Sequence, residues 1–221
     1  MSLLTWLFET NIYFGSKSIP LREIIGGILG LTSAILGARR KILAWPVGII
    51  GDALLFTVFM GAVFTYSDQD SNFYGQAGRN VLLICVSIYG WIRWRSNTSK
   101  SASQSAVIPR WTTTREKIFL IPTVFIGYLL AMSVFRALGE DGTWLLVDTW
   151  IFTGTALATY GMSRGYVEFW LVWIAVDLVG VPFAFINGYY PTATLYAIYL
   201  PFVMWGFISW LKISKNEKVA I

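Results

Sequence analysis

Seven apolar runs of membrane-spanning length constrain this chain more than any other feature of its sequence. A helix needs about 20 mostly apolar residues to cross the hydrocarbon core of a bilayer. Only 13% of the 221 residues are charged, whereas about a quarter is usual for a soluble domain. The sequence therefore predicts an all-α membrane protein with seven transmembrane helices. The runs lie at residues 24–38, 44–66, 75–92, 118–138, 143–163, 167–187 and 192–211.

The segments between the runs divide the chain further. The first fifteen residues are too short to span and lack the basic start and cleavage site of a signal peptide, so an interfacial segment, favoured as a helix, is expected there. A polar stretch rich in Ser, Thr and Lys predicts a flexible cytoplasmic loop. The predicted parts are an N-terminal interfacial segment (1–20), a first three-helix repeat (21–95), the loop (96–117), a connector helix (118–138), a second three-helix repeat (139–213) and a tail (214–221).

The distribution of basic residues predicts how the chain sits in the membrane. Of the 17 Lys and Arg, all but Lys17, Arg22, Arg79 and Arg136 fall on one side of a seven-span arrangement. Loops rich in Lys and Arg stay in the cytoplasm. We therefore expect a multi-pass protein of the cytoplasmic (inner) membrane, with the N-terminus outside and the C-terminus in the cytoplasm. The net charge of +5 is then explained by this topology and by the attraction of the basic loops to the inner leaflet of the lipid bilayer. No nucleic-acid partner is expected.

An internal repeat relates the two halves of the chain. A shift of 125 residues superimposes four positions, and a shift of 116 superimposes four more. The first set pairs Glu23 with Asp148, Arg39 with Arg164, Trp45 with Trp170 and Asp52 with Asp177. The second pairs Tyr74 with Tyr190, Asn80 with Tyr196, Gly90 with Gly206 and Trp94 with Trp210. Two three-helix units joined by one helix share the same orientation, which predicts a 3+1+3 parallel repeat, an architecture of transporters.

Two aspartates of the repeat lie deep inside apolar runs. Asp177 is nine residues from Glu168, or ~14 Å along a helix, and Asp52 is eleven residues from Lys41, or ~16 Å. An ionised carboxylate at this depth costs at least about 2.5 kcal/mol. Three explanations are possible. The first is structural, with each carboxylate bonding a neighbouring polar side chain, and the second is that both carboxylates line a central polar cavity. The third is that the two acids form the catalytic pair of an intramembrane aspartyl protease.

Aromatic and polar residues near the two acids complete a candidate binding site. Trp170, Trp173 and Asp177 share one helix face, and an aromatic plane beside a carboxylate suits a flat, cationic or hydrogen-bonding solute. The predicted substrate-binding residues are Trp173, Asp177, Asn80, Tyr196, Tyr199, Asp52, Trp45 and Ser87. The chain has no histidine and a single cysteine, so no catalytic residue, metal or cofactor is predicted.

Other residues have simpler explanations. Tryptophans near the ends of spans are typical of the aromatic belt at the membrane surface. This interpretation applies to Trp6, Trp91, Trp94, Trp144, Trp205 and Trp210, while Trp45 and Trp170 fit a belt or a site equally. Glu23 and Asp148 lie at the outer ends of their runs, where they complement a helix dipole or form an outer gate.

Several motifs together resemble the PnuC family of vitamin transporters. They are WxxWxxxD at 170–177, YAIYLPFVMWGFISW at 196–210, IYGWIRW at 88–94 and AWPVGIIGDALLF at 44–56. The resemblance covers nearly the whole chain and rests on the order and spacing of these motifs. It implies a 3+1+3 fold similar to the sugar-transporting SWEET proteins, assembled as a homotrimer. It also implies facilitated uptake of a vitamin precursor, foremost nicotinamide riboside, which a cytoplasmic kinase then traps by phosphorylation.

The resemblance leaves the substrate open. In nicotinamide riboside carriers the position of Asp177 is usually Asn, whereas a carboxylate suits thiamine or the hydroxyl groups of a riboside or ribityl chain. The stretch AWPVGIIGDALLFTVF with FYGQAGRN also looks like actinobacterial members, among which riboflavin carriers occur. Coupling of transport to protons through Asp52 or Asp177 stays open as well.

Two other classes of function remain as alternatives. The aspartyl protease would use Asp52 and Asp177, although GIIGD at 48–52 does not match the GxGD pattern of such enzymes. A membrane assembly factor without transport activity would need no polar pairs at the midplane. Other enzymes are not predicted, because neither a GxSxG motif nor a P-loop is present.

Overall fold

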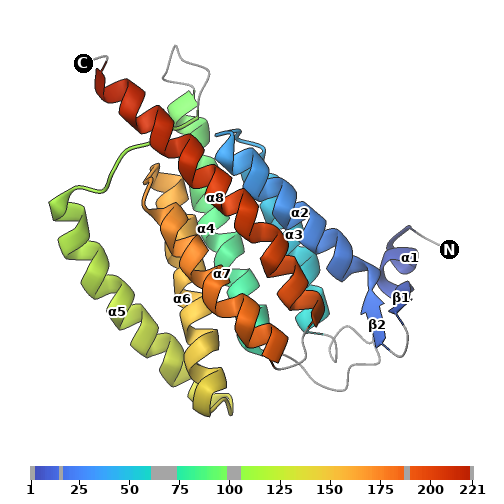
Figure 1. Ribbon diagram of the computed structural model, residues 1–221. Helices are drawn as coiled ribbons and strands as arrows, with labels where there is room; N and C mark the ends of the chain where they lie inside the picture. Colours follow the sequence, from blue (N-terminus) through green and yellow to red (C-terminus); the bar gives the residue numbers. More distant parts are fainter. Residues whose placement is uncertain (1–2, 15–16, 61–73, 99–105, 187–189, 220–221) are drawn as a thin grey trace.

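The computed structural model describes residues 3–14, 17–60, 74–98, 106–186 and 190–219 (Figure 1). Helices dominate these ranges, so the predicted all-α class is confirmed, with one small hairpin added. The elements in order are α1 (Leu3–Glu9), β1 (Asn11–Phe14), β2 (Lys17–Pro20), α2 (Leu21–Ala38), α3 (Ala44–Phe59), α4 (Tyr74–Thr98), α5 (Thr114–Ala137), α6 (Gly142–Arg164), α7 (Phe169–Ile186) and α8 (Tyr190–Val219).

Four helices are long and apolar enough to cross a membrane, judged by length and composition. They are α2, α5, α7 and the part of α8 at Ala193–Asn216, and α3 is a shorter apolar helix. Helices α4 and α6, with 25 and 23 residues, are equally long but carry more polar side chains. Several of these polar side chains are buried between helices, for example Asn80, Thr149 and Thr155. The count of seven spans therefore stays a prediction.

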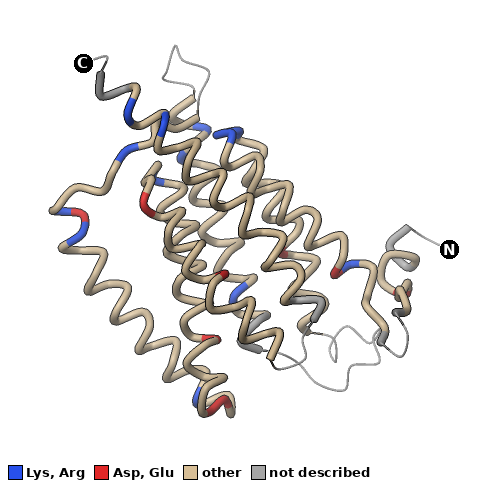
Figure 2. The backbone as a smooth tube through the Cα atoms, viewed as in Figure 1, with Lys and Arg blue, Asp and Glu red and all other residues tan. Residues whose placement is uncertain are grey.

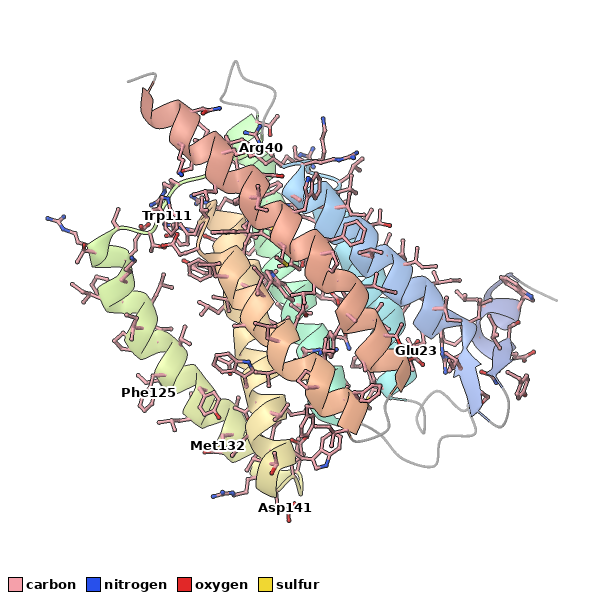
Figure 3. The ribbon with its side chains drawn as sticks, in the orientation of Figure 1. Glu23, Arg40, Trp111, Phe125, Met132 and Asp141 are labelled. Atoms are coloured by element: carbon pink, nitrogen blue, oxygen red, sulfur yellow. The ribbon has the colours of Figure 1, made fainter. Side chains whose placement is uncertain are left out.

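Six helices pack side by side in a closed ring, and one helix lies outside it. Around the ring the contacts run α2–α3–α4–α6–α7–α8 and back to α2, while α5 packs on α6 (Figure 1). Exchanging α2, α3 and α4 with α6, α7 and α8 leaves this order unchanged. The outer face of α5, where Figure 3 labels Phe125 and Met132, carries large exposed apolar side chains such as Phe119 and Ile121.

Hydrogen bonds between the two halves occur in a matched pair. The Trp94 indole Nε1 donates to the backbone oxygen of Ser163 at 3.1 Å, and the Trp210 Nε1 donates to that of Ala38, also at 3.1 Å. Ser163 lies 125 residues after Ala38, and Trp210 lies 116 residues after Trp94. Each half thus bonds the other at equivalent positions, with the same offsets that relate the sequences.

Four buried tryptophans, which we call the tryptophan cluster, form the apolar core next to these bonds. The rings of Trp45 and Trp94 meet edge to face with centroids 5.1 Å apart, and those of Trp170 and Trp210 do so at 5.4 Å. Trp94 and Trp210 have no exposed surface, so their prediction as belt residues is wrong. The reason is that an apolar helix shows no sequence difference between the face toward its neighbours and the face toward lipid.

Part of the predicted flexible loop is packed against the bundle. Ala106 and Val107 are buried against the tryptophan cluster, and Arg110 pairs with Tyr166 in an isolated parallel β-bridge. The Glu116 carboxylate accepts hydrogen bonds from Arg110 Nη1 at 2.8 Å and from the Tyr166 hydroxyl. Residues 106–113, which we call the inner segment, are therefore fixed by backbone and side-chain contacts that the polar composition did not indicate.

The N-terminal segment contains a hairpin as well as a helix. Strands β1 and β2 pair antiparallel, and α1 has only seven residues. The Arg22 guanidinium, with no exposed surface, lies 4.9 Å from the centroid of the Phe8 ring. The interfacial location of residues 1–20 stays a prediction. Residues 61–66 of the predicted second span, residues 99–105 of the loop and the last two of the tail lie outside the described residues.

Charge is distributed unevenly along the bundle. Figure 2 shows most Lys and Arg gathered at the end where α8 finishes, where Glu116 and Glu168 also lie, while the other acidic residues lie toward the middle and the opposite end with a few basic ones. Figure 3 places Arg40 and Trp111 at the basic end and Asp141 at the other. The helices therefore run between a basic end and an acidic end.

Candidate functional site

A half-buried arginine joins both halves of the bundle. Arg79, in the second turn of α4, donates a hydrogen bond from Nη1 to the Tyr196 hydroxyl of α8 at 3.0 Å. Its guanidinium also interacts electrostatically with Asp52 of α3 and Asp148 of α6. A buried charge is tolerated only with opposite charges or hydrogen bonds around it. Arg79 and the two acids therefore stabilise one another between four helices.

A second tyrosine of α8 extends this polar centre toward α7 and α2. The Tyr199 hydroxyl donates to the backbone oxygen of Gly27 at 2.9 Å. It also interacts electrostatically with Asp52, Arg79 and Asp177. We call Asp52, Arg79, Asp148, Asp177, Tyr196 and Tyr199 the polar centre.

Two glycines let the tyrosine rings approach the neighbouring helices. A Cβ at Gly30 would lie 2.5 Å from the Tyr199 hydroxyl oxygen, and a Cβ at Gly180 would lie 3.1 Å from the Tyr196 ring. A side chain at Gly30 would push Tyr199 away, since real Cβ atoms do not come this close to other atoms. The positions of both hydroxyls thus depend on glycines that the sequence places in α2 and α7.

Asp177 lies at a cavity between α7 and α8 that is open to the surroundings, since Leu178, Pro182 and Ala197 of its lining are exposed. Asp177 is 2% exposed, and among the described residues no group donates a hydrogen bond to its Oδ2. The cavity has a volume of about 330 Å³, within the usual range for small-molecule sites. Its walls are otherwise apolar and comprise Leu178, Val181, Pro182, Ala197 and Leu200. A carboxyl in this position can bind a donor or a cation on a bound molecule.

The other predicted site residues lie at different distances from this centre. Asn80 and Ser87 are buried on α4, one and eight residues after Arg79. Trp173 is half-buried one turn before Asp177 and packs against the tryptophan cluster. Trp45 belongs to that cluster and packs on Trp94. The structure thus groups Asp52, Asp177, Tyr196 and Tyr199, while binding roles for all eight residues stay predictions.

Sequence reasoning missed Arg79 and Asp148 as members of the centre. Both lie close to the ends of apolar runs, so they were assigned to the outer surface. Arg79 is five residues into α4, and Asp148 is six residues into α6, which places each about 8 Å or more inside its helix. A signal was present, because opposite charges inside two apolar runs need each other as partners.

The charges of the polar centre are not symmetric between the halves. The repeat places Leu195 at the position equivalent to Arg79. Arg79 interacts electrostatically with both Asp52 and Asp148, whereas within the described ranges no Lys or Arg interacts in this way with Asp177. Among those same residues, no group of three or more Cys, Asp or Glu is arranged to hold a metal ion. The arrangement is suited to binding an organic solute.

Comparisons with known proteins agree on one family. The family model described as nicotinamide mononucleotide transporter matches residues 20–212. The chain is 33% identical over 214 residues to the riboflavin/roseoflavin transporter RibM of Streptomyces davaonensis, covering 97% of this chain and 95% of that protein. It is 22% identical over 232 residues to the nicotinamide riboside transporter PnuC of Escherichia coli, covering 96% and 93%. A crystal structure of the vitamin B3 transporter PnuC matches the fold with a TM-score of 0.68 at 19% identity, covering 88% of this chain and 82% of that one.

Proposed function

This chain belongs to the PnuC family of vitamin transporters, and from that premise we propose that it carries riboflavin into the cell by facilitated diffusion through the polar centre. The observation that carries the proposal is the buried Asp177 carboxyl facing a cavity between α7 and α8. Riboflavin combines a flat ring with a hydroxylated chain. Its chain hydroxyls are donors for a carboxylate, and its ring suits the apolar walls.

The relatives change the order of the candidate substrates. The sequence alone favours nicotinamide riboside, but identity to the riboflavin/roseoflavin transporter is 33% against 22% for the nicotinamide riboside transporter. Nicotinamide riboside remains the second candidate, because its ribose hydroxyls can also donate to the Asp177 carboxylate. Thiamine is the third, because its ring is cationic and Asp177 has no basic partner among the described side chains.

The proposed mechanism is alternating access. Helices α2–α4 and α6–α8 form two like-oriented units that move against each other around the polar centre, so that the site faces one side at a time. The ring order of the helices and the paired tryptophan bonds support two equivalent units. Direction comes from the solute gradient and from phosphorylation of the vitamin by a cytoplasmic kinase.

Three further features belong to this proposal. The chain spans the inner membrane seven times, with α5 as the connector between the units. The basic end of the bundle, where α8 finishes, lies in the cytoplasm and the N-terminus lies outside, in keeping with the clustering of Lys and Arg (Figure 2). The homotrimer implied by the resemblance places part of the exposed α5 face against other copies. Family membership favours this transport activity over the aspartyl protease alternative.

The experiment is uptake by proteoliposomes of labelled riboflavin, nicotinamide riboside and thiamine, each with and without a proton gradient. We expect saturable riboflavin uptake that the proton gradient does not change. Asp177→Asn separates riboflavin from thiamine, because an amide still bonds hydroxyls but cannot neutralise a cation. Riboflavin uptake should keep most of its rate in Asp177→Asn and lose at least about tenfold in Asp177→Ala, which removes the hydrogen bond. Thiamine uptake that both variants abolish would instead establish a substrate bound through its positive charge, and no uptake of any of the three would refute the proposal.

A further inference from the structure

We propose that Arg79 is a positioning residue, which holds the Tyr196 hydroxyl so that it donates a hydrogen bond to a ring carbonyl oxygen of the transported molecule. The inference rests on the proposed function and adds a determinant of specificity to it. A site with this donor selects flat rings that carry a carbonyl acceptor. The dioxopyrimidine edge of riboflavin is such an acceptor.

The direction of one hydrogen bond carries the inference. Arginine has only donors, so in the 3.0 Å contact Arg79 Nη1 donates and the Tyr196 oxygen accepts. The hydroxyl hydrogen of Tyr196 is therefore free to point elsewhere. Among the described residues, the contact with Arg79 is the hydrogen bond in which this hydroxyl takes part. The donor is left for a molecule bound in the centre.

The surroundings of Tyr196 favour a bound molecule as that acceptor. Its ring rests on Gly180, one turn of α7 beyond Asp177, and the next residue of α8, Ala197, lines the cavity. A hydroxyl that accepts from a guanidinium is also a stronger donor, because bonds in a chain polarise one another. Tyr196 does not itself line the cavity, so a molecule that accepts from its hydroxyl must reach from the cavity past Asp177 into the polar centre.

The repeat indicates that Arg79 serves more than the fold. The equivalent position in α8 is Leu195, which packs 3.5 Å from where a Cβ of Gly27 would lie. The fold thus accommodates an apolar side chain at the symmetric place. A guanidinium that is largely removed from water is costly, and Arg79 is half-buried with its Nε buried and without a hydrogen-bond partner among the described residues. The repeat thus has a cation, Arg79, in α4 but none at the equivalent position of α8. Its contact with Tyr196 therefore polarises a single hydroxyl donor of the site.

The test measures riboflavin binding to the purified full-length protein by quenching of flavin fluorescence. The ligands are riboflavin, 2-thioriboflavin and 4-thioriboflavin, since sulfur keeps the ring shape but accepts hydrogen bonds weakly. The variants are Tyr196→Phe, Arg79→Leu and Arg79→Lys, with Tyr128→Phe on α5 as a control that should bind like the wild type. We expect Tyr196→Phe and Arg79→Leu to weaken riboflavin binding about tenfold, and Arg79→Lys to restore most of it.

The thio analogues separate this role from a purely structural one. In the wild type, one of the two should bind about tenfold more weakly than riboflavin, and Tyr196→Phe should weaken it no further. If Tyr196→Phe binds riboflavin like the wild type, or if it weakens all three ligands by the same factor, the inference is overturned while the proposed function stands. If the wild type does not bind riboflavin, the proposed substrate and the inference both fail. Tyr196→Phe decides the matter even if Arg79→Leu does not fold.

Discussion

At the scale of single residues, two glycines determine how closely the tryptophan rings pack. A Cβ at Gly90 would lie 2.5 Å from the Trp45 ring, and one at Gly206 would lie 2.6 Å from the Trp170 ring. The rings are fully buried and cannot move aside. We predict that Gly90→Ala and Gly206→Ala each lower stability by about 1–3 kcal/mol, the usual cost of overpacking. Thermal unfolding in detergent measures this.

Another glycine of α4, the helix that contains Gly90, is the matched control. A Cβ at Gly78 of α4 would meet nothing within 4 Å, so Gly78→Ala should leave the unfolding temperature unchanged or raise it. An equal loss of stability at Gly78 and Gly90 would show that glycine is needed for the helix itself rather than for the ring contact.

One acidic residue outside the helices predicts a dependence of stability on pH. Burial and the nearby charge of Asp148 raise the pKa of Glu140 from 4.5 to about 7. The folded state therefore holds this proton more tightly than the unfolded state does. The resulting loss of stability is absent below pH 4.5, grows as the pH rises and is complete above about pH 7. Between pH 5 and pH 8, we expect the unfolding temperature of Glu140→Gln to fall less than that of the wild type. Parallel plots of unfolding temperature against pH for the two proteins would contradict the raised pKa of Glu140.

At the scale of elements, the inner segment is the largest departure from the sequence prediction. Two adjacent residues of this segment differ in exposure: Val107 is 7% exposed and Ile108 is 54% exposed. In a background with Cys85→Ser, we predict that a thiol reagent modifies Ile108→Cys much faster than Val107→Cys. Adding Glu116→Gln replaces the carboxylate shared by Arg110 and Tyr166 with a neutral amide that accepts at one oxygen, and should speed the modification of Val107→Cys. Equal rates at the two positions would mean that the segment is not packed.

The sequence predicted the elements better than their contacts. Apolar length located α2 and α5 to α7 within a few residues, because a membrane imposes that length. The hairpin was missed, since strands of four residues leave too short a pattern to recognise. The acids Asp52 and Asp177 were noticed because they interrupt apolar runs. The inward direction of Trp94 and the proximity of Arg79 to Asp148 depend on helix packing, which a uniformly apolar sequence does not encode locally.

At the scale of the whole molecule, the uneven charge predicts which end faces the cytoplasm. Asp141 lies at the acidic end and Lys215 near the basic end where α8 finishes (Figures 2 and 3). In cells expressing the Cys85→Ser background, a membrane-impermeant thiol reagent should label Asp141→Cys directly. It should label Lys215→Cys only after the membrane is permeabilised. The reverse pattern would invert the proposed orientation.

The central claim is that one polar centre between two like-oriented units faces each side of the membrane in turn. Counterflow tests it most directly: proteoliposomes loaded with unlabelled riboflavin are diluted into a trace of labelled riboflavin. A carrier with one alternating site should transiently accumulate the label above its outside concentration, and Asp177→Ala should remove this accumulation while Asp141→Ala keeps it. Absence of accumulation in the wild type, or full accumulation in Asp177→Ala, would contradict the account.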